Sequence, residues 1–106
     1  MLSMLLLHLL AEQESYGYEV AQRLQTAGFA DVLEGTVYPA LTRLEREGRL
    51  ATRLVPSPSG PARKYYRLTA AGREALSSAG TLWARHVAAV EAVLSRPLPA
   101  DPEEGS

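Results

Sequence analysis

The chain has 106 residues, of which 46% are hydrophobic, so it is long enough to form one domain with its own core. It contains no cysteine, which excludes disulfide bonds, a thiolate nucleophile and a zinc–thiolate site and suits a reducing cytoplasm. The formal net charge is −1, but residues 43–73 hold eight basic and two acidic side chains, whereas residues 97–106 hold three acidic side chains. A basic central segment is typical of nucleic-acid binding, although a solvated charged face can have a similar composition.

Residues 1–11 are nearly all apolar and predict a helix from about Leu2 to Glu12 that is hydrophobic on every face. The run is too short to cross a bilayer, and it lacks the charged start and cleavage site of a signal peptide. We therefore expect no membrane partner, and we expect part of this helix, including Leu5, to meet a second subunit. His8 is expected to pack rather than to bind a metal, because no second ligand is near.

Residues 14–17 predict a turn, with Ser15 as the N-cap of a second helix over residues 17–27. Gly17 is expected to pack closely against a neighbouring helix, because a single glycine does not make a phosphate-binding loop. Residues 29–33 then form a connector. The apolar side chains expected to anchor it in the core are Phe29, Val32 and Leu33.

Residues 34–50, EGTVYPALTRLEREGRL, predict a short amphipathic helix that follows the second one as in a helix-turn-helix. Thr36 is expected as its N-cap, Pro39 in its first turn, and Gly48 as the residue that ends it. The apolar stripe of this helix consists of Val37, Leu41 and Leu44. The opposite face combines hydrogen-bonding and guanidinium groups and consists of Tyr38, Pro39, Thr42, Arg43 and Arg46. Such a helix fits the major groove of DNA, but an ordinary surface helix with solvated charges would have the same pattern.

Residues 50–55 (LATRLV) and 63–68 (RKYYRL) predict two antiparallel strands, and the Pro- and Gly-rich residues 56–62 between them are expected to be irregular. A two-stranded ribbon in this place is a wing, whose basic residues suit contacts with phosphates. The alternative is a hairpin with a purely structural role. Tyr66 and Leu68 are expected in the core in either case.

Thr69 is expected to cap a last helix that continues without a breaker to about Ser95. Along it, selected residues recur at alternating spacings of four and three, which is the period of a helix that packs along another helix. They are Leu76, Gly80, Trp83, Val87, Val90 and Leu94. Since no other part of the chain is long enough to cover this face, the partner is expected to be a second copy of the chain.

These elements predict a mainly α fold with a small two-stranded β-wing (α+β), namely a winged helix-turn-helix followed by a long C-terminal dimerisation helix. Residues 1–68 are assigned to the DNA-binding domain and residues 69–96 to the dimerisation helix. The acidic, proline-rich residues 97–106 are expected to be a disordered tail.

Three motifs, in this order, resemble those of the PadR family of bacterial transcriptional regulators: YGYEVAQRL (16–24), GTVYPALTRLEREGRL (35–50) and RKYYRLTAAG (63–72). The single long last helix is similar to the short subfamily, which includes the multidrug-responsive members. The resemblance implies a homodimer that binds a pseudo-palindromic operator in double-stranded DNA, usually as a repressor released by a small molecule or another signal.

The resemblance also implies roles for individual residues. The DNA contacts would be made by Thr36, Tyr38, Pro39, Thr42, Arg43, Arg46, Arg63 and Lys64. Of these, Arg46 is expected at a phosphate or at the solvated end of its helix. A flat aromatic effector would stack on Trp83, in a pocket formed by Met4, His8, Leu76, Ala79, Gly80, Trp83 and Val87. The dimer interface would consist of Leu5, Leu76, Gly80, Trp83, Val87, Val90 and Leu94. As an alternative, Trp83 is only the largest side chain of that interface.

An enzyme is not expected. There is no cysteine, His8 and His86 are far apart in the chain, and no glycine-rich phosphate loop or metal-ligand spacing occurs, so neither a metal nor a cofactor is predicted. A second alternative is a winged-helix module that only dimerises or binds other proteins. That module would show no salt-sensitive DNA binding, and the basic residues 43–73 argue against it.

Overall fold

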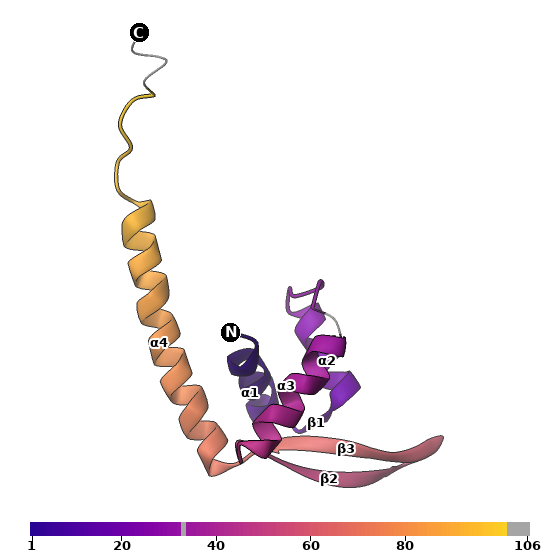
Figure 1. Cartoon of the computed structure of the whole chain (residues 1–106). Helices are drawn as coiled ribbons and strands as arrows, with labels where there is room; N and C mark the ends of the chain where they lie inside the picture. Colours follow the sequence, from indigo (N-terminus) through magenta and orange to yellow (C-terminus); the bar gives the residue numbers. More distant parts are fainter. Residues whose placement is uncertain (33, 102–106) are drawn as a thin grey trace.

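The structure is a computed structural model that describes residues 1–32 and 34–101. The elements in chain order are α1 (Leu2–Glu12), β1 (Ser15–Tyr16), α2 (Gly17–Thr26), α3 (Glu34–Arg46), β2 (Leu50–Ser57), β3 (Gly60–Leu68) and α4 (Ala70–Leu94). Figure 1 shows a body built from α1, α2, α3 and the sheet, with α4 rising from its base as a rod. The predicted core anchor Leu33 and the last five residues of the predicted tail lie outside the described residues.

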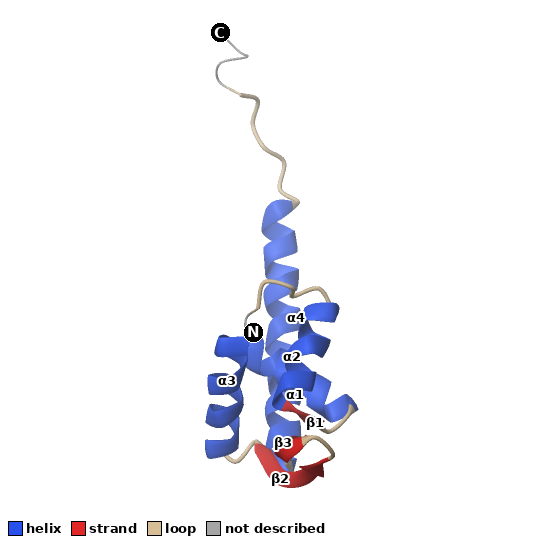
Figure 2. Ribbon diagram, turned by 90° about the vertical axis from the view of Figure 1, so that its right-hand side faces the viewer, coloured by secondary structure: helices blue, strands red, loops and turns tan. Residues whose placement is uncertain are grey.

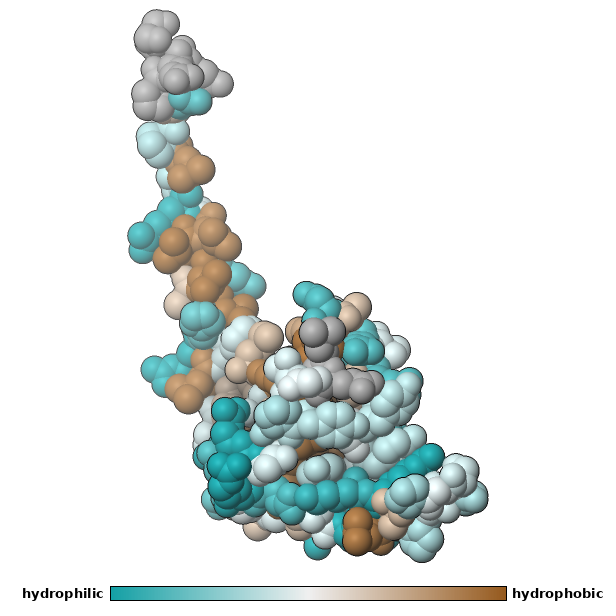
Figure 3. All heavy atoms as spheres, turned by 45° about the vertical axis from the view of Figure 1, so that its right-hand side comes forward, coloured by the Kyte–Doolittle hydropathy of each residue, from teal (hydrophilic) through white to brown (hydrophobic). Residues whose placement is uncertain are grey.

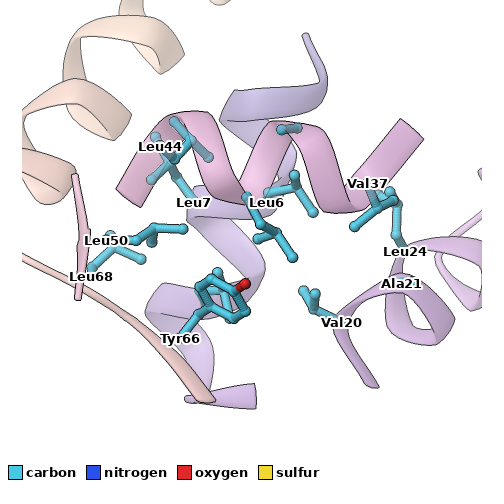
Figure 4. Packing of buried hydrophobic residues seen from close by; sticks show 13 residues of the cluster. Leu6, Leu7, Val20, Ala21, Leu24, Val37, Leu44, Leu50, Tyr66 and Leu68 are labelled. Carbon is cyan, nitrogen blue, oxygen red and sulfur yellow. The ribbon is translucent and has the colours of Figure 1, made fainter. Parts of the chain in front are cut away.

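The core lies where α1, α2 and α3 meet the base of the hairpin, at the beginning of β2 and the end of β3 (Figure 4). The periodic stripe predicted for α3 is confirmed, because Val37, Leu41 and Leu44 are buried. They pack in one cluster with side chains from α1 and α2, such as Leu6 and Leu24, and with Tyr66 from β3. The full set of buried hydrophobic residues is Leu6, Leu7, Leu10, Val20, Ala21, Leu24, Val37, Ala40, Leu41, Leu44, Leu50, Tyr66 and Leu68.

The sheet has three antiparallel strands in the order β1-β3-β2, and not the two that the sequence predicted. The predicted turn over residues 14–17 contains β1, in which Ser15 pairs with Tyr66 and Tyr16 with Tyr65. Ser15 is therefore buried, and its hydroxyl donates to the Gln13 carbonyl (3.2 Å) and accepts from Arg23 (2.8 Å). It does not cap α2, whose N-cap is Tyr16 without a side-chain hydrogen bond.

The hairpin is longer than predicted, because β2 and β3 extend into residues 56–62 and leave only Pro58 and Ser59 as the turn. Proline is tolerated in a strand at a bulge or where the amide lacks a partner strand. The register shifts between Val55 and Ser57, which places Pro56 at an irregular position of β2. The prediction of an irregular segment was wrong, because proline breaks a strand only where its missing N–H would have to pair with a neighbouring strand.

The start of α3 also differs from the prediction, and its end agrees. The helix begins at Glu34, so Thr36 lies inside the first turn and is not the N-cap, while Pro39 lies one turn deeper than predicted. Gly48 ends the helix with a positive φ of 76°. Its N–H donates to the Glu45 carbonyl, and the next N–H donates to the Leu44 carbonyl (3.0 and 2.9 Å), as in the usual glycine-terminated helix end.

The first turn of α4 is fixed to the end of α3. As predicted, Thr69 caps α4, because its hydroxyl accepts from the Gly72 N–H (3.1 Å); it also donates to the Gly48 carbonyl (2.6 Å). Beyond this joint α4 packs against α1 with its lower half, and its upper half continues past the body (Figures 1 and 2). The direction of α4 relative to the body is therefore set by this joint together with the packing of its lower half on α1.

We expect Gly72→Ala to destabilise the protein. A Cβ at Gly72 would overlap the carbonyl oxygen of Arg49 and lie 3.3 Å from Leu68 Cγ, and such overpacking typically costs about 1–3 kcal/mol. The measurement is the free energy of unfolding in urea. Gly35→Ala is the control, since a Cβ there would meet no described atom within 4 Å apart from the adjoining residues and backbone of its own helix, and it should be neutral or stabilise by up to about 1 kcal/mol. Equal stabilities of the two variants would contradict the tight joint.

Candidate nucleic-acid interface

The outward face of α3 is a row of exposed residues opposite the buried stripe. Gly35, Pro39, Thr42 and Arg46 follow one another at spacings of four, three and four, so they share one side of the helix, and all four are exposed. We call these four residues the reading face. The sequence had placed Pro39, Thr42 and Arg46 on this side of the helix, and it had missed Gly35.

Tyr38 and Arg43 flank the reading face on opposite sides. Tyr38 leans over Gly17 at the start of α2, so closely that a Cβ on Gly17 would overlap its ring. Arg43 instead extends toward α1, where its guanidinium donates to the Ser3 hydroxyl (3.2 Å). The predicted close packing of Gly17 is confirmed, and the structure places Arg43 at the α1 side of α3 rather than at the centre of the reading face.

On the outer face of the sheet, arginines lie over tyrosine rings. The guanidinium carbon of Arg63 is 4.5 Å from the ring centroid of Tyr16, whose ring is 5.4 Å from that of Tyr65. Arg53 lies 5.8 Å from the Tyr65 centroid and is paired with Glu14. The hydrogen bond from Arg53 lowers the pKa of the Glu14 carboxyl. Cation–π contacts of this kind hold a guanidinium in place without removing its charge, so Arg63 remains available to an anion.

Lys64 points the other way, toward α3. Its Nζ donates to Oε1 of Glu45 (2.8 Å), and the hydroxyl of Thr52 donates to Oε2 of the same carboxylate (2.9 Å). These hydrogen bonds, that from Lys64 first, lower the pKa of Glu45, and the Glu45 carboxylate raises the pKa of Lys64. The two predicted wing contacts therefore differ, because Lys64 has a carboxylate partner on α3. Local sequence patterns assign Glu45 no role, since this contact spans nineteen positions.

This ion pair predicts a pH-dependent contribution to stability. The charged Glu45 carboxylate contributes above its ordinary pKa of 4.5, and the contribution is lost as the pH falls through the lowered pKa of the folded protein. We expect Glu45→Gln to be less stable than the wild type at pH 7 by at most about 1 kcal/mol, because the pair is partly exposed. Urea unfolding at pH 7 and at an acidic pH below the lowered pKa of Glu45 should show that this difference vanishes in acid. A difference of equal size at both pH values would contradict a stabilising contribution from the charged Glu45 carboxylate.

A hollow of about 330 Å³ lies between the start of α2, the first half of α3 and β3. Its lining consists of Tyr16, Gly17, Tyr18, Tyr38, Arg63, Lys64 and Tyr66. Three of the predicted DNA-contact residues, Tyr38, Arg63 and Lys64, thus come together at one place. Tyr16 and Tyr18 were not predicted to lie here, although both belong to the YGYEVAQRL motif.

The upper part of α4 exposes large apolar side chains, seen as brown spheres above the body in Figure 3. Trp83 is 43% exposed and Leu94 is 78% exposed. The others are Leu82, Val90 and Val93. Of the residues predicted for the dimer interface, Leu5 and Leu76 are partly buried against the core of their own subunit, while Gly80 is exposed and Val87 is half-buried. Leu82 and Val93 are exposed on the same helix and were not among the predicted interface residues.

A second hollow, of about 430 Å³, lies beside Trp83 where α1 approaches α4. It is lined by Met1, Met4, Ala79, Leu82, Trp83 and His86, and the ring centroids of Trp83 and His86 are 5.6 Å apart. The structure thus brings together three of the predicted pocket residues, Met4, Ala79 and Trp83. The other four, His8, Leu76, Gly80 and Val87, are not part of this lining.

Within residues 1–32 and 34–101, no three histidine, aspartate or glutamate side chains lie close enough to hold a metal ion. In the same part of the chain, none of the helices combines the length and the apolar character that a membrane span needs.

Comparison with known proteins identifies the family. Residues 6–78 match the model of the transcriptional regulator PadR-like family. Transcriptional regulator Rv3488 of Mycobacterium tuberculosis is 43% identical over 74 residues, which cover 68% of this chain and 65% of that protein. The crystal structure of a PadR-like transcriptional regulator from Bacillus cereus is similar with a TM-score of 0.81 at 34% identity, covering 91% of this chain and 93% of the other. A Streptococcus transcriptional regulator gives a TM-score of 0.80 at 36% identity, covering 89% and 92%. The chain therefore belongs to the PadR-like family of transcriptional regulators, which are DNA-binding proteins and not enzymes.

Proposed function

We propose that the protein is a homodimeric repressor that binds a pseudo-palindromic operator and leaves it when a flat aromatic effector binds beside Trp83. Residues 1–68 act as the DNA-binding unit and residues 69–96 as the dimerisation helix, in the cytoplasm. The DNA contacts come from the reading face with Thr36, Tyr38 and Arg43 beside it, and from Arg63 and Lys64 of the wing.

The observation that carries this proposal is the apolar face of upper α4. Exposed side chains such as Trp83, Val90 and Leu94 form a stripe on the part of α4 that extends beyond the rest of the subunit. Soluble monomers rarely expose large contiguous apolar surfaces. The stripe has the spacing of helix-on-helix packing, which fits a second α4. A two-fold pairing through α4 would set the distance between two copies of α3, and an operator requires about 34 Å or a multiple of it.

The hollow beside Trp83 supports the effector part of the proposal. Its volume of about 430 Å³ is in the range of small-molecule pockets, and its lining offers an indole, an imidazole and methionine side chains. An effector bound there would touch both α1 and α4. It can release DNA only if it favours an arrangement of the two subunits in which the α3 spacing no longer matches the operator.

The proposal is tested by light scattering combined with DNA binding. We expect a dimer at micromolar concentration that selects a two-fold symmetric site from a pool of random duplexes, with an affinity that falls steeply between about 50 and 200 mM salt. A monomer would contradict the homodimer. A dimer without salt-sensitive DNA binding would favour the protein-interaction module instead.

The effector is tested with the single tryptophan of the chain, whose fluorescence reports Trp83 alone. Titration with planar cationic or phenolic compounds should quench the emission, and the same compounds should lower the affinity for the selected duplex. A panel of such compounds that neither quenches nor releases DNA would leave Trp83 as an interface residue only.

A further inference from the structure

We propose that Glu45 is a specificity-determining residue, which holds Lys64 against α3 so that this lysine meets a DNA phosphate only when α3 itself is seated in the groove. The inference rests on the proposed function and assigns a role to a carboxylate at the edge of the proposed DNA-binding face. Negative charge beside a DNA-binding face weakens the attraction to phosphates, so its presence there calls for a physical reason.

The contact fixes the lysine on two sides. Its Nζ donates to Glu45 at 2.8 Å and lies 5.5 Å from the ring centroid of the buried Tyr66. Glu45 is itself fixed by the hydroxyl of Thr52, at 2.9 Å. The side chains of Lys64 and Glu45 are 46% and 31% exposed, so the pair remains partly open to solvent while it is held. Because an ammonium group has three N–H donors, it can bind Glu45 and a phosphate at the same time.

The position of Glu45 on α3 places its ion pair with Lys64 beside the residues proposed to contact DNA. Tyr38, Thr42 and Glu45 follow one another at spacings of four and three, so they lie along one edge of α3, the edge that faces the wing. Lys64 also lines the hollow between α3 and β3. A phosphate that enters this hollow therefore meets a cation whose place is defined relative to α3.

On DNA of arbitrary sequence, α3 gains no base contacts and the complex depends on phosphate contacts alone. A tethered Lys64 can then reach few phosphates, and Glu45 repels them. Arg63 differs, because the described residues place no carboxylate in hydrogen-bonding contact with it. We thus expect Arg63 to contribute to binding of any duplex, and Lys64 to contribute mainly to the operator complex.

The experiment compares wild-type protein with Glu45→Gln, Lys64→Gln, the double variant, and Glu47→Gln as a control. The control removes the same charge from an exposed residue just past the end of α3. Each protein is titrated with the duplex that the wild type selects and with a random-sequence duplex of equal length, between about 50 and 200 mM salt. The circular dichroism spectrum and the urea midpoint of each variant establish that it is folded.

We expect Glu45→Gln to bind the random duplex about two- to fivefold more tightly, with a log–log salt slope steeper by about 0.9, the value for one added phosphate contact. The selected duplex should change by less, and the double variant should match Lys64→Gln. The inference is overturned if Glu47→Gln has the same effect, or if the gain persists without Lys64. If the wild type shows no salt-dependent binding to either duplex, the proposed function is refuted. If the wild type binds and Glu45→Gln has the same affinities as the wild type for both duplexes, only this inference is refuted.

Discussion

Replacing Val90 and Val93 together by glutamate is expected to give a folded monomer that no longer binds its operator tightly. Both side chains lie on the exposed apolar face of α4, at 42% and 53% exposure, and neither belongs to the core cluster of its own subunit. The body should therefore keep its stability, while charges placed in a helix pair should prevent dimerisation. Without the second half-site the affinity for the selected duplex should fall by about 10²–10⁴-fold. Light scattering and gel-shift titration of the same sample measure both effects.

The control for this experiment is Ala88→Glu with Ala92→Glu. These alanines are exposed on the other side of α4, so the variant adds the same charge to the same segment of helix. It should remain dimeric and bind the selected duplex within about threefold of the wild type, since exposed charges far from an interface contribute little. A control that dissociates as readily as the test variant would show that added charge, and not the loss of the apolar face, explains the monomer.

The second large effect is expected from Arg46→Ala. Arg46 is exposed and lies on the same side of α3 as Pro39 and Thr42, so we expect its guanidinium to enter the groove together with this face. Loss of a guanidinium that binds a guanine edge costs about 1–3 kcal/mol and relaxes specificity at one base pair. Competition titrations with single-base variants of the selected duplex measure this. If Arg46 contacts a phosphate instead, the loss will be the same for all sequences and the salt slope will fall by about 0.9.

Arg43→Ala is the matched control, because it removes an identical side chain one turn away. Its guanidinium is directed to Ser3 of α1, so we expect a loss below about 1 kcal/mol, in the range of a peripheral charge. A larger loss for Arg43 than for Arg46 would mean that Arg43 leaves Ser3 and that the reading face is centred on the α1 side of α3.

The features that the sequence predicted correctly depend on residues close together in the chain. The spacing of Val37, Leu41 and Leu44 predicts the buried side of α3, because a helix repeats every 3.6 residues, and Thr69 and Gly48 act on their own helix ends. The three PadR-like motifs are equally local, and the family match extends over all of them. For these features no knowledge of distant contacts is needed.

The features of the sheet that the sequence predicts wrongly depend on distant partners. Residues 15–16 have the pattern of a turn because a two-residue strand has no periodicity, and only pairing with residues 65–66 of β3 makes them a strand. The prolines of the hairpin predict a break because local propensity does not tell whether an amide has a strand beside it.

The local pattern of residues is sufficient to predict the helices, the two strands of the hairpin, the buried side of α3 and the family. The partners of the charged side chains follow only from the tertiary packing: Arg43 is joined to Ser3, Arg53 to Glu14, and Lys64 to Glu45. These pairs are nineteen to forty positions apart, and a periodic pattern carries no information about such contacts. The sequence gives the charge of each side chain, but the partner that restrains it depends on how helices and strands pack. This packing leaves Arg63 over an aromatic ring and binds Lys64 to a carboxylate.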